Sequence, residues 1–239
     1  MSSAAASLEA LIRKAAVFDG DLARNIKGIR VSQDLFDDLS ADASDRAAAI
    51  AAESASRTPS AAPLITRPFD YGSVVTYPFV PHNWQATRYS DGLHYGVWYG
   101  ALELETTVYE TVYHWHRFVM DSFAGLEREI AGERRVFQVR CDAVLIDLRD
   151  VSEPRLTDRR DYSFTWQVGR FLSQRGQSGL LSRSARSSGT AAAVFRPEVL
   201  RDVRDLCFLT YRMSPSVDAV TVERTPGSAW LEIRPSALA

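Results

Sequence analysis

The residues of this chain that could act together chemically are concentrated in one stretch, RYSDGLHYGVWYGALELETTVYETVYH, residues 88–114. It contains a guanidinium (Arg88), a phenol (Tyr99) and a carboxylate (Glu110). A guanidinium binds phosphate or carboxylate groups, a tyrosine ring stacks and hydrogen-bonds, and a carboxylate stabilises a nearby positive charge. Each residue also has a plain structural interpretation: a surface arginine, a core tyrosine and a solvated carboxylate. Taken one by one, the side chains do not decide between a site and an ordinary core.

Helix phase gives the position of Glu110. The segment TTVYETVYHWHRFV, residues 106–119, predicts a helix that begins at Thr106 or Thr107. At about 100° per residue, Glu110 points away from the apolar stripe of that helix, which consists of Val108, Val112, Trp115 and Val119. We therefore expect Glu110 either on the solvated surface, which the phase alone favours, or in the wall of a cleft.

A second polar stretch, GLLSRSARSSG, covers residues 179–189. It follows an apolar strand and contains Ser184 as a candidate, with a flexible surface loop as the alternative interpretation. No histidine–carboxylate pair is evident near Ser184, so we do not expect this serine to act as an acyl nucleophile.

Several classes of site are excluded by the motifs that the chain lacks. There is no GxGxxG after a strand, no GxxxxGK[ST], no HExxH and no GxSxG. Cys141 and Cys207 stand alone, without zinc-ligand spacing. His114 and His116 diverge by about 200° on a helix, so they do not form a metal pair. We expect no metal and no resident cofactor.

Composition limits the partners. The chain has 239 residues, of which 46% are hydrophobic and 24% charged, as in a globular protein with a sizeable core. A net charge of −2 argues neither for a protein that coats nucleic acid nor for an acidic solvating one. The N-terminal MSSAAASLEALIRKAAVFDG lacks the pattern of a signal peptide, and no apolar run has membrane-spanning length. We expect a cytoplasmic protein without membrane or direct nucleic-acid contacts.

The first sixty residues predict helices. Apolar side chains recur at helical spacing near the start of the chain, and SQDLFDDLSADASDRAAAIAAE, residues 32–53, continues the helical pattern; the first set is Leu8, Leu11, Ala15 and Phe18. SRTPSAAP, residues 56–63, ends this part. We therefore divide the chain into an N-terminal helical segment, 1–60, and a main domain, 61–239.

The main domain predicts strands and a few helices without regular alternation, which indicates the α+β class. The expected helices are that of residues 106–119 and YSFTWQVGRFLSQRG, residues 162–176, which ends at Gly176. The expected strands lie at 64–69, 73–80, 95–102, 135–141 and 143–150, and the segments 178–197, 205–213 and 228–235 are strand-rich.

The order of the two polar stretches resembles the RES domain, a family named for its Arg, Glu and Ser. The first block of that family runs from a turn containing Arg, through a Tyr strand, to a helix carrying Glu. The second runs from Gly and apolar residues through Ser-Ala-Arg and a glycine loop to a strand ending Phe-x-Pro. The matching residues here are Arg88, Tyr99, Glu110, Gly179, Ser184, Ala185, Arg186, Phe195 and Pro197. Thr87 stands where the family usually has glycine, and Arg67 resembles the arginine of its first strand.

The resemblance, which covers residues 64–212, implies a fold and a reaction. The fold is ADP-ribosyltransferase-like, with a split β-sheet core and flanking helices, and it binds NAD+ as substrate without a Rossmann turn. Glu110, Arg88 and Ser184 become the catalytic candidates. The implied NAD+ contacts are Arg67, Arg88, Tyr99, Ser184 and Arg186.

The resemblance also implies an enzyme that degrades NAD+ by cleaving its nicotinamide–ribose bond, as the toxin of a bacterial toxin–antitoxin system held in check by an Xre-type antitoxin. Hydrolysis and phosphorolysis share this first step. A mono-ADP-ribosyltransferase that modifies a protein, and a catalytically silent interaction module, are the alternatives. A homodimer and a toxin–antitoxin hetero-oligomer both stay open.

Overall fold

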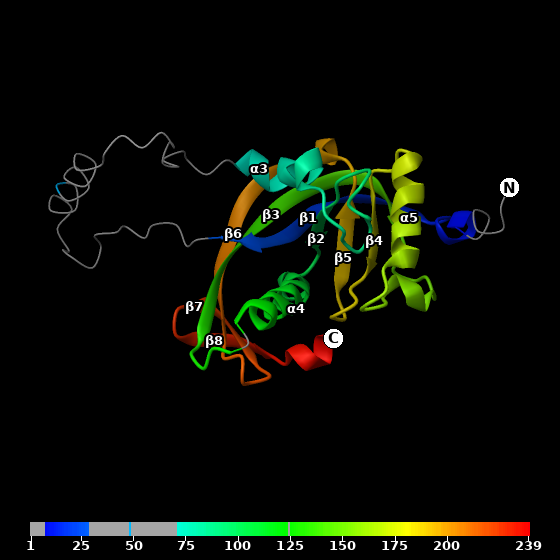
Figure 1. Cartoon of the computed structure of the whole chain (residues 1–239). Coiled ribbons are helices and arrows are strands. Elements are labelled where there is room, and N and C mark those ends of the chain that lie inside the picture. The colour runs from blue at the N-terminus through cyan, green and yellow to red at the C-terminus, as the bar shows by residue number, and fades with distance from the viewer. Residues whose placement is uncertain (1–7, 29–47, 49–70, 124) are drawn as a thin grey trace. The chain divides into compact units, whose positions relative to one another are not determined.

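The computed structural model describes residues 8–28, 48, 71–123 and 125–239 (Figure 1). The chain divides into two units, Met1–Gly28 with Tyr71–Ala239, and Ile29–Asp70. The sheet and the helices that pack on it belong to the first unit. The helix expected over 32–53, the strand expected over 64–69 and the candidate Arg67 lie outside the described residues.

The described residues form one eight-stranded mixed sheet with flanking helices, which confirms the α+β class. The strand order is β1-β2-β5-β4-β3-β6-β7-β8, and β1 also pairs with β3. The strands are β1 (Ala15–Lys27), β2 (Trp98–Ala101), β3 (Ile130–Asp147), β4 (Gly179–Arg183), β5 (Thr190–Val194), β6 (Leu200–Met213), β7 (Val220–Thr225) and β8 (Ser228–Ile233).

The long strand β3 is where the sheet splits. Its end, Ile146 and Asp147, pairs with β4 in parallel, whereas the preceding part, from Ile130 to Cys141, pairs with β6 in antiparallel. The other edge of this strand pairs with β1 from Arg134 to Ile146. The sequence predicted two separate strands here. The structure has one continuous strand that holds the β2-β5-β4 half and the β6-β7-β8 half of the sheet together.

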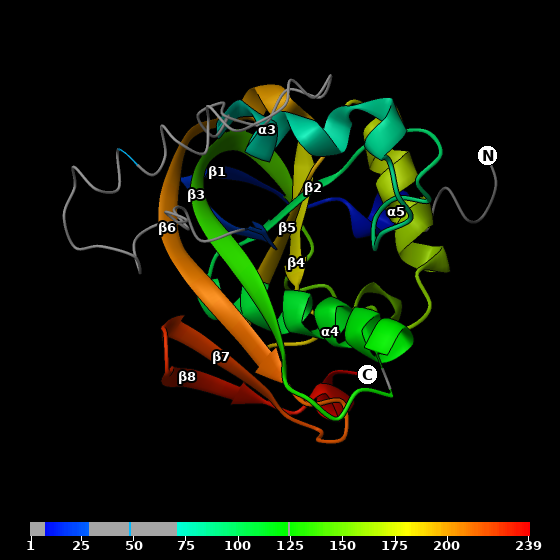
Figure 2. The same cartoon turned by 60° about the vertical axis from the view of Figure 1, so that its left-hand side comes forward.

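Within the described residues, α3, α4 and α5 pack on the sheet. α4 (Leu104–Phe123) buries Val108, Val112 and Val119 completely against residues of β6, β7 and β8. Figure 2 shows α4 crossing below the ends of β4 and β5, with β7 and β8 on its other side. α5 (Ser163–Gln174) packs on β4 and β5 (Figure 1). The short α3 (Tyr71–Thr76) packs on the β1-β3-β6 part.

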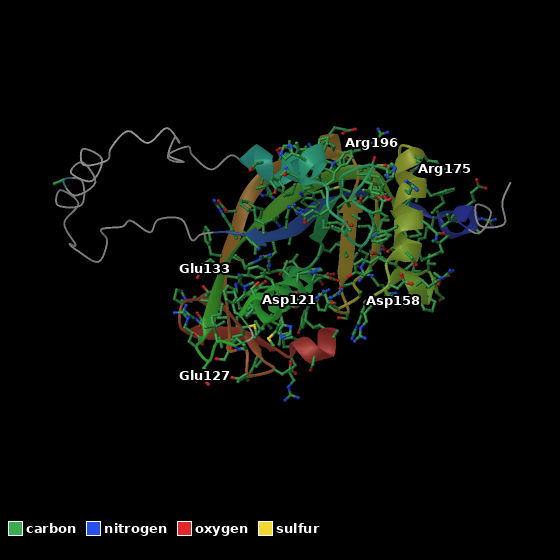
Figure 3. The ribbon with its side chains drawn as sticks, viewed as in Figure 1. Asp121, Glu127, Glu133, Asp158, Arg175 and Arg196 are labelled. Carbon is green, nitrogen blue, oxygen red and sulfur yellow. The ribbon has the colours of Figure 1, made fainter. Side chains whose placement is uncertain are left out.

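Glycine ends α5 as the sequence predicts. Gly176, two residues past the last helical residue, adopts a φ of 67°, a left-handed conformation that costs glycine little. Arg175 and Arg196 lie beside this end of the helix (Figure 3). The strand expected around Trp98 and the helix carrying Glu110 are likewise confirmed, although α4 begins at Leu104 rather than at Thr106 or Thr107.

Two local predictions are wrong. Residues 8–11 are helical, but the helix expected to continue through Ala15 and Phe18 gives way to β1, thirteen residues that pair with β3 along their whole length. Helix propensity is a weak preference that such a ladder overrides. The strand expected over 73–80 is instead α3 followed by a 3-10 turn, Tyr77–Phe79, which accommodates Pro78 in its first positions.

None of the described helices is both long enough and apolar enough to cross a membrane.

We predict that Leu145→Ala lowers the free energy of unfolding by about 2–5 kcal/mol. Leu145, on β3, is fully buried in the core cluster shared with Trp98 and Phe137, so its removal leaves a cavity. The control is Leu206→Ala on β6, whose side chain is 40% exposed. Urea denaturation followed by fluorescence measures both variants, and equal midpoints for the two would contradict the assignment of this core.

Candidate functional site

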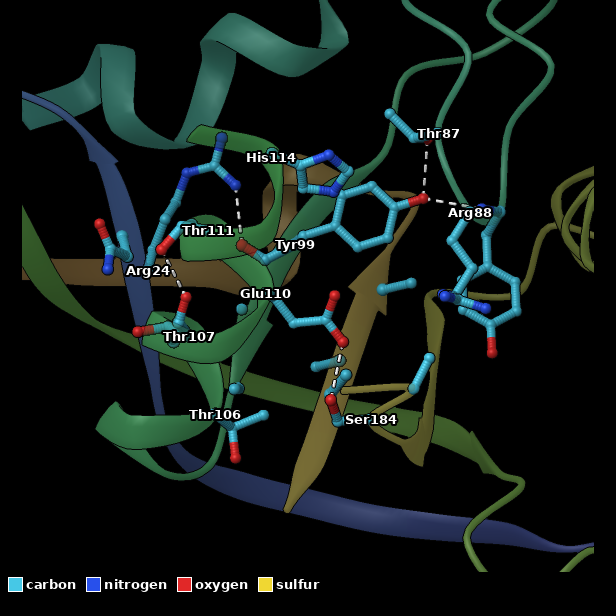
Figure 4. A pocket seen from close by; sticks show the side chains of 18 of the residues that line it. Arg24, Thr87, Arg88, Tyr99, Thr106, Thr107, Glu110, Thr111, His114 and Ser184 are labelled. Atoms are coloured by element: carbon cyan, nitrogen blue, oxygen red, sulfur yellow. Dashed lines mark hydrogen bonds between the residues drawn. The ribbon is translucent and has the colours of Figure 1, made fainter. Parts of the chain in front are cut away.

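A cavity of about 490 Å³ lies where α4, β1, β2 and the residues following β4 meet. Its walls include Arg88, Tyr99, Glu110 and Ser184, four of the residues singled out from the sequence (Figure 4). Arg186 hydrogen-bonds to Glu110 and Ser184 but does not line the cavity. Segments far apart in the sequence thus meet around one space, whose volume is within the range usual for small-molecule sites.

Glu110 is fixed on the cavity wall by two partners from the segment after β4. The Ser184 hydroxyl donates a hydrogen bond of 2.7 Å to its Oε1, and Arg186 Nη1 donates one of 3.3 Å to its Oε2. The Glu110 side chain is 25% exposed. The helix phase placed it correctly, away from the buried stripe of α4, and the structure shows the cleft position rather than the fully solvated one.

Ser184 is positioned by the turn that follows β4. Its Oγ accepts hydrogen bonds from the backbone N–H groups of Arg186 (3.0 Å) and Ser187 (3.1 Å), and its own N–H bonds to the carbonyl of Gly189 (2.9 Å). The hydroxyl proton therefore has one remaining direction, toward Glu110. This arrangement makes Ser184 a donor that orients the carboxylate.

Arg186 lies behind Glu110. Its side chain is 0% exposed, and its guanidinium stacks 3.7 Å above the ring of Tyr113. Nη2 donates to the carbonyl of Arg159 (3.2 Å) and to the Tyr162 hydroxyl (3.4 Å). The resemblance implied either a phosphate contact or a brace for the loop at Arg186, and its position in this structure suits it to hold Glu110 in place.

Tyr99 holds the turn that carries Arg88. Its hydroxyl accepts from the Tyr89 N–H at 2.8 Å and lies 2.8 Å from the Thr87 Oγ1. Burial raises the pKa of Tyr99 above its ordinary value, so the phenol stays protonated at neutral pH. Thr87, at the position where the family that the sequence resembles usually has glycine, contributes through its side chain to this turn.

Arg88 lies at the side of the cavity against the turn that contains Asp158. Its Nη1 donates to the Asp158 carbonyl at 2.7 Å, and the guanidinium lies 4.6 Å from the centre of the Tyr162 ring. The second terminal nitrogen, Nη2, is buried without a partner among the described residues. An unpaired buried donor is unusual in a folded protein and marks Arg88 as a candidate for binding an anion.

Arg24, on β1, is a cavity residue that sequence reasoning missed. Its Nη1 donates to the Tyr99 carbonyl at 2.8 Å, the guanidinium lies 5.0 Å from the Trp98 ring, and its buried Nε has no partner among the described residues. Burial lowers the pKa of Arg24 to about 9, which leaves it protonated at neutral pH. The sequence did not single out Arg24, because a helix was predicted for this region. A helix there does not predict the sheet that brings Arg24 into contact with Tyr99.

His114 also lines the cavity, one helical turn after Glu110. Partial burial and the charge of Arg186 lower the pKa of this histidine below its ordinary value near 6.5. No group of three or more metal-ligating side chains occurs in the part of the chain that the structure describes.

Comparisons with known proteins give the family. No curated protein sequence matches this chain. Among solved structures, it is similar to a chain in the crystal structure of the M. tuberculosis MbcT–MbcA toxin–antitoxin complex, with 13% identity, a TM-score of 0.47, and coverage of 87% of this chain and 91% of that chain. The model of the RES domain matches residues 63–214, more than half of the 239 residues. The chain therefore belongs to the RES domain family.

Proposed function

We propose that this protein is the toxin of a toxin–antitoxin system and that it degrades NAD+ by cleaving the nicotinamide–ribose bond. Its membership of the RES domain family supports this role. The observation that carries the proposed chemistry is the carboxylate of Glu110, fixed by Ser184 and Arg186 on the wall of a cavity that also contains Arg24 and Arg88.

The carboxylate suits the bond that breaks. Loss of nicotinamide leaves an oxocarbenium-like ribose, and an anion beside the sugar stabilises its positive charge and hydrogen-bonds a ribose hydroxyl. The electron pair of the broken C–N bond neutralises the pyridinium ring, so nicotinamide departs neutral and needs no general acid. One oriented carboxylate is therefore sufficient for the first step, and Glu110 supplies it.

The two arginines suit the pyrophosphate. Arg24 and Arg88 each have a buried N–H donor without a partner among the described residues, and phosphate oxygens are strong acceptors for such donors. Binding there would satisfy donors that the protein itself leaves unpaired. Tyr99 would face the ribose end, and Arg67 stays a further candidate for the pyrophosphate.

The acceptor separates the remaining alternatives. Water gives a glycohydrolase, phosphate a phosphorylase, and a protein side chain a mono-ADP-ribosyltransferase. Nicotinamide release with and without phosphate distinguishes the first two, and label from NAD+ appearing on a macromolecule would favour the third. Normal growth on expression, without nicotinamide release, would favour a catalytically silent module.

The toxin role implies an antitoxin partner. We infer an Xre-type protein that binds this enzyme in the cytoplasm, where the NAD+ pool is found. Co-expression with a neighbouring Xre-like reading frame should restore growth, and co-purification of the two proteins would establish the complex.

We predict that Glu110→Gln lowers nicotinamide release by about 10²-fold or more, since it removes the charge that faces the developing cation. Glutamine keeps the shape and an acceptor oxygen for Ser184, but it leaves the buried Arg186 guanidinium without its anion, so the melting temperature should fall, and activity is measured at a temperature where the variant remains folded. The matched control is Glu105→Gln, at an exposed position of the same helix. Full activity in the Glu110 variant would contradict the proposed chemistry.

We predict that Arg24→Met and Arg88→Met each raise the KM for NAD+ about tenfold or more, because each removes charge-assisted hydrogen bonds to phosphate. The kcat should change less, since the pyrophosphate is remote from the bond that breaks. Arg201→Met, at an exposed position of β6, is the control. Steady-state kinetics decide: an unchanged KM in both cavity variants would show that the pyrophosphate binds elsewhere.

A further inference from the structure

The cavity contains a second titratable side chain that the proposed first step does not use. His114 follows Glu110 by four residues on α4, so the two side chains lie about 40° apart on the same face of the helix. Both line the cavity, and Figure 4 shows the imidazole of His114 in the pocket together with the Glu110 carboxylate and Tyr99. An acceptor in this cavity would therefore have both groups beside it.

The imidazole of His114 is free to accept a proton. Within the described residues, neither ring nitrogen makes a hydrogen bond, and its ring contact is an edge-on packing against Tyr113, with centroids 5.2 Å apart. The residue is exposed, so solvent reaches it. Glu110, in contrast, already accepts hydrogen bonds at both oxygens, from Ser184 and Arg186.

The surrounding charges favour the neutral imidazole. Although solvent reaches part of this residue, the protein atoms packed around the ring displace much of its water, and this desolvation is the largest influence and lowers the pKa of His114. Three cations act in the same direction: Arg186 from the turn after β4, Arg117 from α4 itself, and Arg88 from the turn before β2. Glu110 opposes them, and the pKa still falls below its ordinary value. At neutral pH the ring therefore carries a lone pair rather than a second proton.

We propose that His114 is the general base that activates the water attacking the ribose, an inference that rests on the proposed cleavage of NAD+. The C–N bond to nicotinamide breaks, and its electron pair stays with the departing nicotinamide. A bond forms between the water oxygen and the anomeric carbon, and the water proton moves to a ring nitrogen of His114. The products are nicotinamide and ADP-ribose, and His114 releases its proton to solvent.

With these roles, Glu110 and His114 each have the charge state that their part of the reaction requires. Glu110 stays an anion beside the positive ribose, where taking the proton would remove the charge that stabilises the transition state. His114 begins neutral and ends protonated, as a base does.

The test compares His114→Gln with His116→Gln, a histidine on the same helix that does not line the cavity. Hydrolysis of NAD+ is measured as ADP-ribose formation in phosphate-free buffer across a range of pH. We expect His114→Gln to lower the rate about 10²-fold and His116→Gln to leave it unchanged. The wild-type rate should fall as the pH drops through the pKa of His114, below about 6.5, and this acidic limb should be absent from the His114 variant.

A second variant guards against a folding defect. His114→Ala, checked by its melting temperature, should regain activity when imidazole is added, which a merely structural role would not allow. A His114→Gln rate within twofold of wild type overturns the inference, and so does a slow variant that keeps the acidic limb or an alanine variant that imidazole does not rescue.

Failure of the proposed function is distinguishable from failure of this inference. Wild-type protein that releases no nicotinamide under any condition overturns both. Release that requires added phosphate, with none in its absence, overturns only the role of His114, because the phosphate dianion attacks without losing a proton.

Discussion

The arrangement of the site depends on one buried interaction, the contact of Glu110 with Ser184 and Arg186. A fully buried guanidinium is costly unless an anion and hydrogen-bond acceptors surround it. Glu110 supplies the anion, and Tyr113, Arg159 and Tyr162 supply the ring face and the acceptors. The carboxylate is thus positioned by what lies behind it, which leaves its other side open to the cavity.

The split sheet brings the two sides of this interaction together. Glu110 comes from α4, which packs on the β6-β7-β8 half, whereas Ser184 follows β4 in the other half. Glu103 joins the two at the start of α4, since its Oε2 accepts from Thr106 Oγ1 and from the N–H of Thr190 at the start of β5, each at 2.9 Å. Gly189 is required there, because a Cβ would collide with Thr106 and Glu103.

The region of the cavity contains buried polar atoms that have no hydrogen-bond partner within the described residues, among them Arg186 Nε behind Glu110. Buried donors on Arg24 and Arg88 lack partners within the described residues, although each guanidinium is held in place by a backbone carbonyl and an aromatic ring. Each such donor destabilises the free protein, and a bound anion that accepts its hydrogen bond removes this free-energy cost. These two arginines differ from the exposed arginines that form surface ion pairs, because each is held in a fixed position and still has an N–H donor without an acceptor among the described residues.

The sequence by itself determined the elements with strong local periodicity and the family. The apolar stripe of α4 predicted the direction of Glu110, and Gly176 predicted the end of α5. The order of the two polar blocks gave the RES resemblance. Helix phase, turn conformation and motif order can all be read directly from the order of residues along the chain. Only the tertiary structure decided that residues 15–27 form a strand bearing Arg24, that Arg186 lies behind Glu110, and that His114 shares its cavity. These features depend on contacts between residues far apart in the chain, such as that of Glu110 with Ser184, which are separated by 74 residues in sequence number. Such contacts leave no periodic trace in the sequence, since the sheet that creates them forms only when all its strands pair.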